Sequence, residues 1–189
     1  MIYCIIGKSA SGKDTIYKKI INKIPNINKI TLYTTRPKRE NEKEGIEYFF
    51  VNEDFLKQNK NKIIEQRTYN TIYGPWIYAM IDDGSINSKN NYLLLSTLES
   101  YNSIKKYFGE ENVFPIYINV PNDIRLQRAK DRVNILDENT KKEIERRFKA
   151  DEIDFSTQKI KEANITKIYD NANLQNCINE IYNDIMETF

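Results

Sequence analysis

The sequence predicts an α/β fold, a parallel sheet with flanking helices, and two observations carry that prediction. Short apolar runs rich in β-branched residues recur along the chain, beginning with IYCII at 2–6. Segments with helical periodicity follow several of these runs, for example after 91–96 and after 113–119. Strands that alternate with helices are typical of parallel sheets with right-handed crossovers. The section 31–82 breaks the alternation, so we expect an inserted subdomain there.

The individual elements follow from the same patterns. Buried strands read as apolar runs, and helices as apolar positions three and four residues apart. A glycine loop after 2–6 leads into a helix that ends near Ile24, because Pro25 and Asn26 follow. Further strands are expected at 29–35, 48–51, 91–96, 113–119 and 165–170, with a small antiparallel pair at 62–69 and 71–74. Further helices are expected at 52–59 with Asn52 as N-cap, and at 98–108, 122–132, 139–163 and 173–187.

Length and composition indicate one globular domain. The chain has 189 residues, of which 40% are hydrophobic and 30% charged. A net charge of +2 gives no bulk electrostatic reason to expect nucleic-acid binding. The absence of His excludes His-based acid–base catalysis and His-ligated metal sites. We see no signal peptide and no apolar run as long as a membrane span, so a cytoplasmic location without a membrane partner is expected.

The stretch GKSASGKDT (7–15) has the G-x-x-x-x-G-K spacing of a phosphate-binding P-loop. An apolar strand precedes it and a helical pattern follows. Spacing and context therefore both favour a P-loop over an ordinary glycine turn. Backbone N–H groups at the helix N-terminus would cradle phosphates, and Lys13 would reach the β- and γ-phosphates. The motif therefore predicts a sheet of the P-loop NTPase type. The residues expected to hold the nucleotide here are Gly7, Ser9, Ser11, Gly12, Lys13, Asp14 and Thr15.

A second informative stretch, YTTRPKRENEKEGIEYFF (33–50), brings two arginines and a tyrosine close together in the chain. Arg36 and Arg39 are suited to bidentate phosphate binding, and the Tyr48 hydroxyl adds a donor. Taken alone, the same residues also suit a solvated charged loop.

Residues 34–51, which overlap this stretch and extend it to Val51, resemble the TTR-x-x-R-x-x-E-x-x-G-x-x-Y-x-F-V block of guanylate kinases, with the P-loop at the expected distance before it. Weaker matches follow in the family's order: IIEQRTYNTIYG (63–74), RAKDR (128–132), ERRF (145–148) and YDNANL (169–174). The resemblance implies an ATP-dependent nucleoside monophosphate kinase in one domain, 1–189. Its parts would be a core (1–30, 83–124 and 164–189), an inserted NMP-binding subdomain (31–82) and a helical lid (125–163).

The resemblance also implies roles for particular residues. On the acceptor side, Glu65 would accept the guanine N1–H and 2-amino groups, and the phosphate would be held by Arg36, Arg39, Tyr48 and Tyr73, with Glu42 beside them. On the ATP side, Asn171 would lie near the base, and the lid arginines Arg128, Arg132 and Arg147 would cover the transferring phosphate. For these three arginines a solvated helix face is the alternative. The catalytic set would be Lys13, Arg36, Arg132 and Arg147.

Asp14 stands where the family has a hydroxyl residue, and strand 91–96 lacks the family's acidic residues at its end, where Ser96 and Thr97 stand. We interpret the two departures as one exchange. Asp14 would contact Mg²⁺, directly or through water, while Ser96 or Thr97 completes the outer shell and Thr97 borders the substrate. The alternative is that Asp14 is a first-turn acid favoured by the helix dipole.

A third departure concerns the base. Leu32 replaces a serine that reads guanine O6 in the family, and Pro75 replaces Ser or Thr. The expected reaction is therefore phosphorylation of GMP or dGMP by ATP, with another nucleoside monophosphate as the alternative acceptor. A catalytically inactive module that binds a phosphorylated partner is the other alternative, in a chain that is a monomer or a homodimer.

Overall fold

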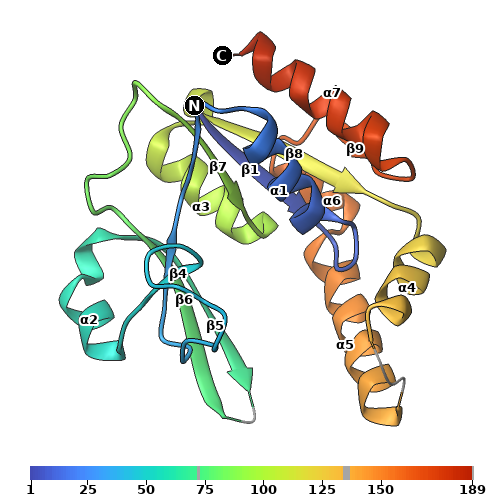
Figure 1. Ribbon diagram of the computed structural model, residues 1–189, viewed down its shortest axis with the longest axis horizontal. Coiled ribbons are helices and arrows are strands. Elements are labelled where there is room, and N and C mark those ends of the chain that lie inside the picture. Colours follow the sequence, from blue (N-terminus) through green and yellow to red (C-terminus); the bar gives the residue numbers. More distant parts are fainter. Residues whose placement is uncertain (72, 134–136, 189) are drawn as a thin grey trace.

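In the computed structural model, a five-stranded parallel sheet has the strand order β2-β7-β1-β8-β9 (Figure 1). The structure describes residues 1–71, 73–133 and 137–188. Neighbouring strands in this sheet all pair in parallel, which confirms the predicted fold class. The strands are β1 (Ile2–Gly7), β2 (Ile27–Lys29), β7 (Asn91–Leu95), β8 (Val113–Asn119) and β9 (Ile168–Asp170).

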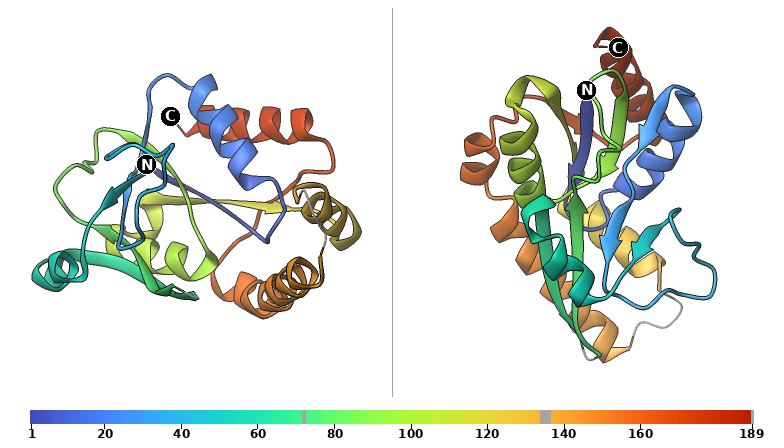
Figure 2. Two further views of the ribbon diagram at one scale, coloured as in Figure 1. Left: turned by 60° about the horizontal axis from the view of Figure 1, so that its bottom comes forward. Right: turned by 90° about the vertical axis from the view of Figure 1, so that its left-hand side faces the viewer.

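Helices cover both faces of this sheet. Successive side chains of β1 point to opposite faces, so they contribute to a separate buried cluster on each side. Ile2, Cys4 and Ile6 belong to a buried cluster with α3 (Leu98–Phe108) and α6 (Thr157–Glu162). Tyr3 and Ile5 belong to a second cluster with α1 (Lys13–Lys23) and α7 (Leu174–Glu187). The left view of Figure 2 shows α1 and α7 together on one side of the sheet. The core is thus two apolar layers with the sheet between them.

A second sheet has the strand order β4-β3-β6-β5. Its strands are β3 (Leu32–Thr34), β4 (Tyr48–Phe50), β5 (Ile63–Thr71) and β6 (Gly74–Ile81), and all four lie within 31–82. Helix α2 (Glu53–Gln58) packs its buried Leu56 against Ala79 and Ile81 of β6. Asn52 is the N-cap of α2, as predicted, and its side chain accepts from the Phe55 N–H at 2.8 Å.

Two further helices, α4 (Asn122–Asp131) and α5 (Glu138–Asp154), complete the described elements, with short 3₁₀ turns at Lys60–Lys62 and Glu110–Asn112. Figure 1 shows the β5–β6 hairpin and α5 extending past the edge of the parallel sheet where β1 ends. Ligands of open α/β sheets bind at this edge. Among the residues described, none of the helices combines the length and the apolar character that a membrane span needs.

Three expected boundaries were wrong. Residues 29–35 form two strands, because β2 pairs with β7 in the first sheet and β3 with β6 in the second. The second hairpin strand is 74–81, not 71–74, because the chain reverses between Thr71 and Gly74. The helix expected at 139–163 is broken at Phe155, whose ring turns into the core and stacks on Tyr117. Ser156 then caps a new helix by accepting from the Lys159 N–H.

Candidate active site

The loop between β1 and α1 has the backbone of an anion-binding turn. Gly12, the N-cap of α1, has φ 90° and no side chain to cap the helix. The N–H groups of the first turn therefore remain available to a ligand. A Cβ on Gly7 would lie 2.8 Å from the carbonyl oxygen of Ile118, so this position requires glycine. Ala10 adopts φ 59°, a left-handed conformation that costs a non-glycine residue about 1 kcal/mol.

Lys13 is the centre of a group of charges at the start of α1. Burial lowers the pKa of Lys13, the negative charges of Asp14 and Asp151 raise it, and the positive charges of Arg147 and Arg132 lower it further. These four side chains are thus close enough to act on the lysine. Arg132 and Arg147 are themselves exposed. Arg132 also lines the pocket beside Gly12 and Thr15, so the structure places this arginine next to the P-loop, whereas Arg147 is related to Lys13 only through its charge.

A cavity of about 180 Å³ lies beside the P-loop, lined by Gly12, Thr15, Arg128, Arg132, Asn171 and Leu174. The Arg128 Nη2 donates to the Asn171 carbonyl at 2.9 Å, and the Asn171 Nδ2 donates to the Ser11 carbonyl at 2.8 Å. Among the described residues, Asn171 Oδ1 and Arg128 Nη1 are buried without a hydrogen-bond partner. An unpaired acceptor and an unpaired donor at a cavity beside a P-loop fit a nucleotide.

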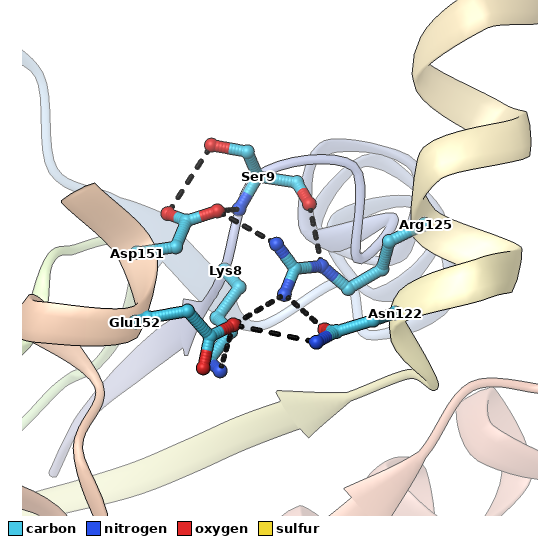
Figure 3. A network of polar contacts seen from close by, with 6 residues as sticks. All are labelled: Lys8, Ser9, Asn122, Arg125, Asp151 and Glu152. Carbon is cyan, nitrogen blue, oxygen red and sulfur yellow. Dashed lines mark hydrogen bonds and ion pairs between the residues drawn. The ribbon is translucent and has the colours of Figure 1, made fainter. Parts of the chain in front are cut away.

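A buried ion pair ties the P-loop to helices α4 and α5 (Figure 3). The Arg125 Nη2 donates to Asp151 at 2.8 Å, and the Arg125 Nε donates to the Ser9 carbonyl at 3.0 Å. The Ser9 N–H donates to the same carboxylate at 2.8 Å. Next to this pair, Lys8 and Glu152 form an ion pair at 2.8 Å. The P-loop and both helices are therefore held together in this structure.

Two P-loop residues predicted to hold phosphate have other partners here. The hydroxyl of Ser9, like its N–H, donates to Asp151. Ser11 is buried and its N–H donates to the Lys8 carbonyl at 3.2 Å, while its hydroxyl has no hydrogen-bond partner among the described residues. In this structure the amides of the first turn of α1, from Lys13 onward, are therefore better placed for phosphate than either serine.

On the second sheet, Arg36 lies at the centre of a polar cluster. Its Nη2 donates to Glu42 Oε1 at 2.7 Å and its Nε to the Tyr78 hydroxyl at 3.2 Å. The guanidinium lies 5.6 Å from the centre of the Tyr48 ring. The hydrogen bond from Arg36 holds the pKa of Glu42 below its usual value. With Nη1 bonded to the Pro37 carbonyl, three of the five N–H donors are used and two remain for a ligand.

Arg39 completes this cluster through its main chain, because its N–H donates to Glu42 Oε2 at 2.8 Å, and its side chain is exposed. Arg36, Arg39, Glu42 and Tyr48 therefore lie together, as predicted. Tyr73 does not join them in the part of the chain that the structure describes. Tyr73 lies at the turn of the β5–β6 hairpin, so its side chain is 78% exposed. Its ring stacks on that of Trp76, with 6.2 Å between the ring centres.

Glu65 is a buried carboxylate on β5. The Ser100 hydroxyl, from α3, donates to Glu65 Oε2 at 2.9 Å, and the Thr97 hydroxyl lies 3.0 Å from that of Ser100. Burial raises the pKa of Glu65, while the Arg67 charge and the Ser100 hydrogen bond lower it. Thr97 thus reaches the carboxylate through Ser100. A fixed, desolvated carboxylate of this kind suits a ligand with N–H donors.

The chain matches the family model described as guanylate kinase over residues 1–188. It belongs to the guanylate kinase family. Since that family phosphorylates nucleoside monophosphates, the protein is a kinase and a transferase.

Guanylate kinases of two bacteria are similar to it along most of the chain. That of Malacoplasma penetrans is 30% identical over 161 residues, which cover 83% of this chain and 80% of the relative. That of Mycoplasma genitalium is 28% identical over 195 residues, covering 100% of this chain and 76% of the relative. A crystal structure of guanylate kinase from Anaplasma phagocytophilum has the same fold, with TM-score 0.68, 22% identity, and coverage of 100% of this chain and 85% of that one.

Several polar residues at the kinase's candidate site escaped the sequence analysis. Ser100 holds Glu65, and Tyr78 holds Arg36. Arg125 and Asp151 tie the P-loop to the helices. A usable signal existed only for Ser100, which lies three residues after Thr97, the spacing of an N-cap and the N–H it binds. The other contacts join segments far apart in the sequence or cross between strands, and no local pattern reports them.

Proposed function

We propose that this kinase transfers the γ-phosphoryl group of ATP to GMP, with ATP on the P-loop and the GMP phosphate on the Arg36 cluster. The observation that carries the choice of acceptor is the buried Glu65 carboxylate. Guanine offers N1–H and 2-amino donors side by side, and adenine offers no such pair. A base without these donors would leave the carboxylate only its contacts with Ser100 and Arg67 and would not form the two hydrogen bonds that guanine offers.

The parts of the chain divide the work in this proposal. Residues 31–82, which contain the whole second sheet, form the NMP-binding subdomain. Residues 125–163, which contain most of α4 and all of α5 and α6, form the lid. The core supplies the P-loop. The cavity beside Gly12 receives the nucleoside part of ATP, where Asn171 Oδ1 offers an acceptor and Arg128 Nη1 a donor.

In the transfer step, an oxygen of the GMP phosphate attacks the γ-phosphorus of ATP. The new O–P bond forms as the bond from the γ-phosphorus to the β–γ bridging oxygen breaks, and ADP leaves with that electron pair. No general base is required, because the acceptor phosphate is already ionised, which agrees with a chain without His. Lys13, Arg132 and Arg147 stabilise the charge on the transferring group, and Arg36 positions the acceptor.

Magnesium would supply charge neutralisation across the ATP phosphates. The described residues contain no cluster of three or more acidic, Cys or His side chains, which fits an ion held mainly by phosphates and water. Asp14 is exposed at the start of α1 and is the carboxylate we assign to it. The Ser96 hydroxyl donates to the Thr97 carbonyl at 2.9 Å and keeps its lone pairs for a water of the outer shell.

We expect Asp14→Ala to weaken the use of Mg·ATP by roughly ten- to 100-fold, the usual effect of losing a group that supports a metal. ADP binding without Mg²⁺ should change little, because the first-turn amides and Lys13 remain. The use of Mg·ATP is measured as turnover at increasing Mg²⁺ concentration. The binding of ADP without Mg²⁺ is measured by calorimetric titration in EDTA. Asp54→Ala is the matched control, because the Asp54 side chain is exposed near the start of α2. Equal losses in both measurements would mean that Asp14 serves the helix or the loop and not the metal.

The function itself is tested by a coupled assay of ADP formation with Mg·ATP and each of GMP, dGMP, AMP, CMP, UMP and dTMP. Turnover with GMP or dGMP alone is the expected result. Turnover with another acceptor would show that the kinase phosphorylates a different nucleoside monophosphate. GMP binding without turnover by any acceptor would favour the inactive binding module. A cytoplasmic location and a monomeric or homodimeric state remain part of the proposal.

A further inference from the structure

An arginine that the mechanism above leaves unused lies directly against the Glu65 carboxylate. Arg67 is two residues further along β5, so its side chain emerges on the same face of the strand. Its Nε lies 3.3 Å from Glu65 Oε2, and its Nη2 lies 3.4 Å from Glu65 Oε1. The side chains are 17% and 3% exposed. The guanidinium therefore spans both oxygens of the carboxylate.

This contact is loose compared with the other buried ion pairs of the protein. Arg36 meets Glu42 at 2.7 Å and Arg125 meets Asp151 at 2.8 Å, distances normal for charge-assisted hydrogen bonds. The Arg67 Nε, in contrast, is buried and has no hydrogen-bond partner among the described residues. The arginine neutralises Glu65 with one long hydrogen bond, from Nη2, and its Nε is free for a better acceptor.

Guanine supplies such an acceptor on the edge that Glu65 binds. Its O6 is next to N1, and N7 follows O6, so a base held by Glu65 presents two acceptors beside the carboxylate. A buried O6 without a donor would cost binding free energy. Arginine donating to guanine O6 and N7 is the commonest specific contact to this base in nucleic-acid recognition, and it depends only on the base. Neither Leu32 nor Pro75 has a side-chain donor.

The surroundings of Arg67 place it on the acceptor side of the site. It pairs with Tyr78 across the hairpin, the residue whose hydroxyl accepts from Arg36. Its charge also lowers the pKa of Tyr48, which burial raises. Arg67 therefore lies between the residue assigned to the base and those assigned to the phosphate.

We propose that Arg67 determines base specificity together with Glu65. In this structure its guanidinium lies against both oxygens of the carboxylate, which the N1–H and 2-amino groups of guanine would also contact. When GMP binds, guanine takes the carboxylate, and Arg67 turns to O6 and N7. This inference rests on the proposed function, since it takes GMP as the acceptor.

The test compares GMP, 6-thio-GMP and 7-deaza-GMP by calorimetric titration without ATP. The first analogue weakens the acceptor at position 6 and the second removes N7. In Arg67→Met the affinity for GMP should fall roughly 10- to 100-fold, and the affinities for the analogues should fall less. Arg67→Lys should lie between, because it keeps the charge and loses the fork. The preference for GMP over IMP, which reports the 2-amino contact with Glu65, should persist.

Arg146→Met is the matched control, because Arg146 is exposed on α5 and bonded to Glu143, and thermal unfolding checks that each variant is folded. An equal fall for GMP and both analogues would show that Arg67 only neutralises Glu65, and would overturn the assignment. Unchanged affinities would overturn it as well. If the wild-type chain does not bind GMP, the proposed function fails and the assignment falls with it. If the wild-type chain binds GMP, and Arg67→Met keeps the wild-type preference for GMP over the two analogues, the assignment of Arg67 is contradicted and the proposed function is not.

Discussion

Arg36→Met is expected to lower kcat/KM for GMP on the order of 30- to 1,000-fold, about 2–4 kcal/mol of transition-state stabilisation. The physical reason is position as well as charge. The guanidinium is buried, bonded to Glu42 and Tyr78 and packed on Tyr48, so its two remaining N–H donors point in fixed directions. The KM for ATP should change little, because ATP binds at the P-loop. Steady-state kinetics with each substrate varied in turn measures both effects.

Lys38→Met is the control for this loop, since Lys38 is exposed and outside the cluster. Because Arg36 also neutralises Glu42, the double variant Arg36→Met with Glu42→Gln separates catalysis from folding. The double variant should recover stability and not kcat/KM. A kcat/KM for Arg36→Met within threefold of the Lys38→Met value would rule out a role for Arg36 at the acceptor phosphate.

Asp151→Ala is expected to destabilise the folded protein by about 3–5 kcal/mol, as removing one partner of a buried ion pair does. The Arg125 side chain is 1% exposed and would keep only the longer contact of its Nη1 with Glu152, at 3.8 Å. The Ser9 N–H and hydroxyl would lose their acceptor at the same time. Urea unfolding, followed by circular dichroism, gives the free energy of unfolding.

The matched control is Glu152→Ala, on the next residue of α5. The Glu152 side chain is 54% exposed, pairs with Lys8 at 2.8 Å and lies 3.8 Å from the Arg125 Nη1, and an exposed carboxylate of this kind should cost less than about 1 kcal/mol when it is removed. The double replacement Arg125→Leu with Asp151→Leu should be much less destabilising than Asp151→Ala, because no buried charge remains. If Asp151→Ala and Glu152→Ala cost the same, the buried pair does not hold the P-loop to α5.

Local signals in the sequence located the parts of the site that local structure makes. The P-loop was predicted from glycine spacing between a strand and a helix, and Gly12 has the positive φ that such a turn requires. The arginines of the acceptor side were predicted from a short block, and Arg36, Glu42 and Tyr48 do lie together. Their roles on a substrate remain predictions.

Contacts between distant segments were out of reach for the same analysis. The segment 29–35 reads as one strand in the sequence, yet its halves pair in different sheets, since pairing depends on partners elsewhere. Ser9 has a P-loop position, but the Asp151 carboxylate that takes its N–H comes from 142 residues further along. Arg67 is a different case, because it lies two residues after Glu65 in the expected strand 62–69, and the alternation of that strand was a usable signal for placing both on one face.

The central claim, that Glu65 selects guanine, is tested most directly by kcat/KM for GMP and for AMP in the wild type and in Glu65→Gln. The amide keeps one acceptor and turns an N–H toward the donors of guanine. We expect kcat/KM for GMP to fall at least about tenfold, the loss that one unmade hydrogen bond to a charged group produces, while the low value for AMP stays nearly constant. An unchanged preference for GMP, or equal losses for GMP and AMP, would contradict the claim.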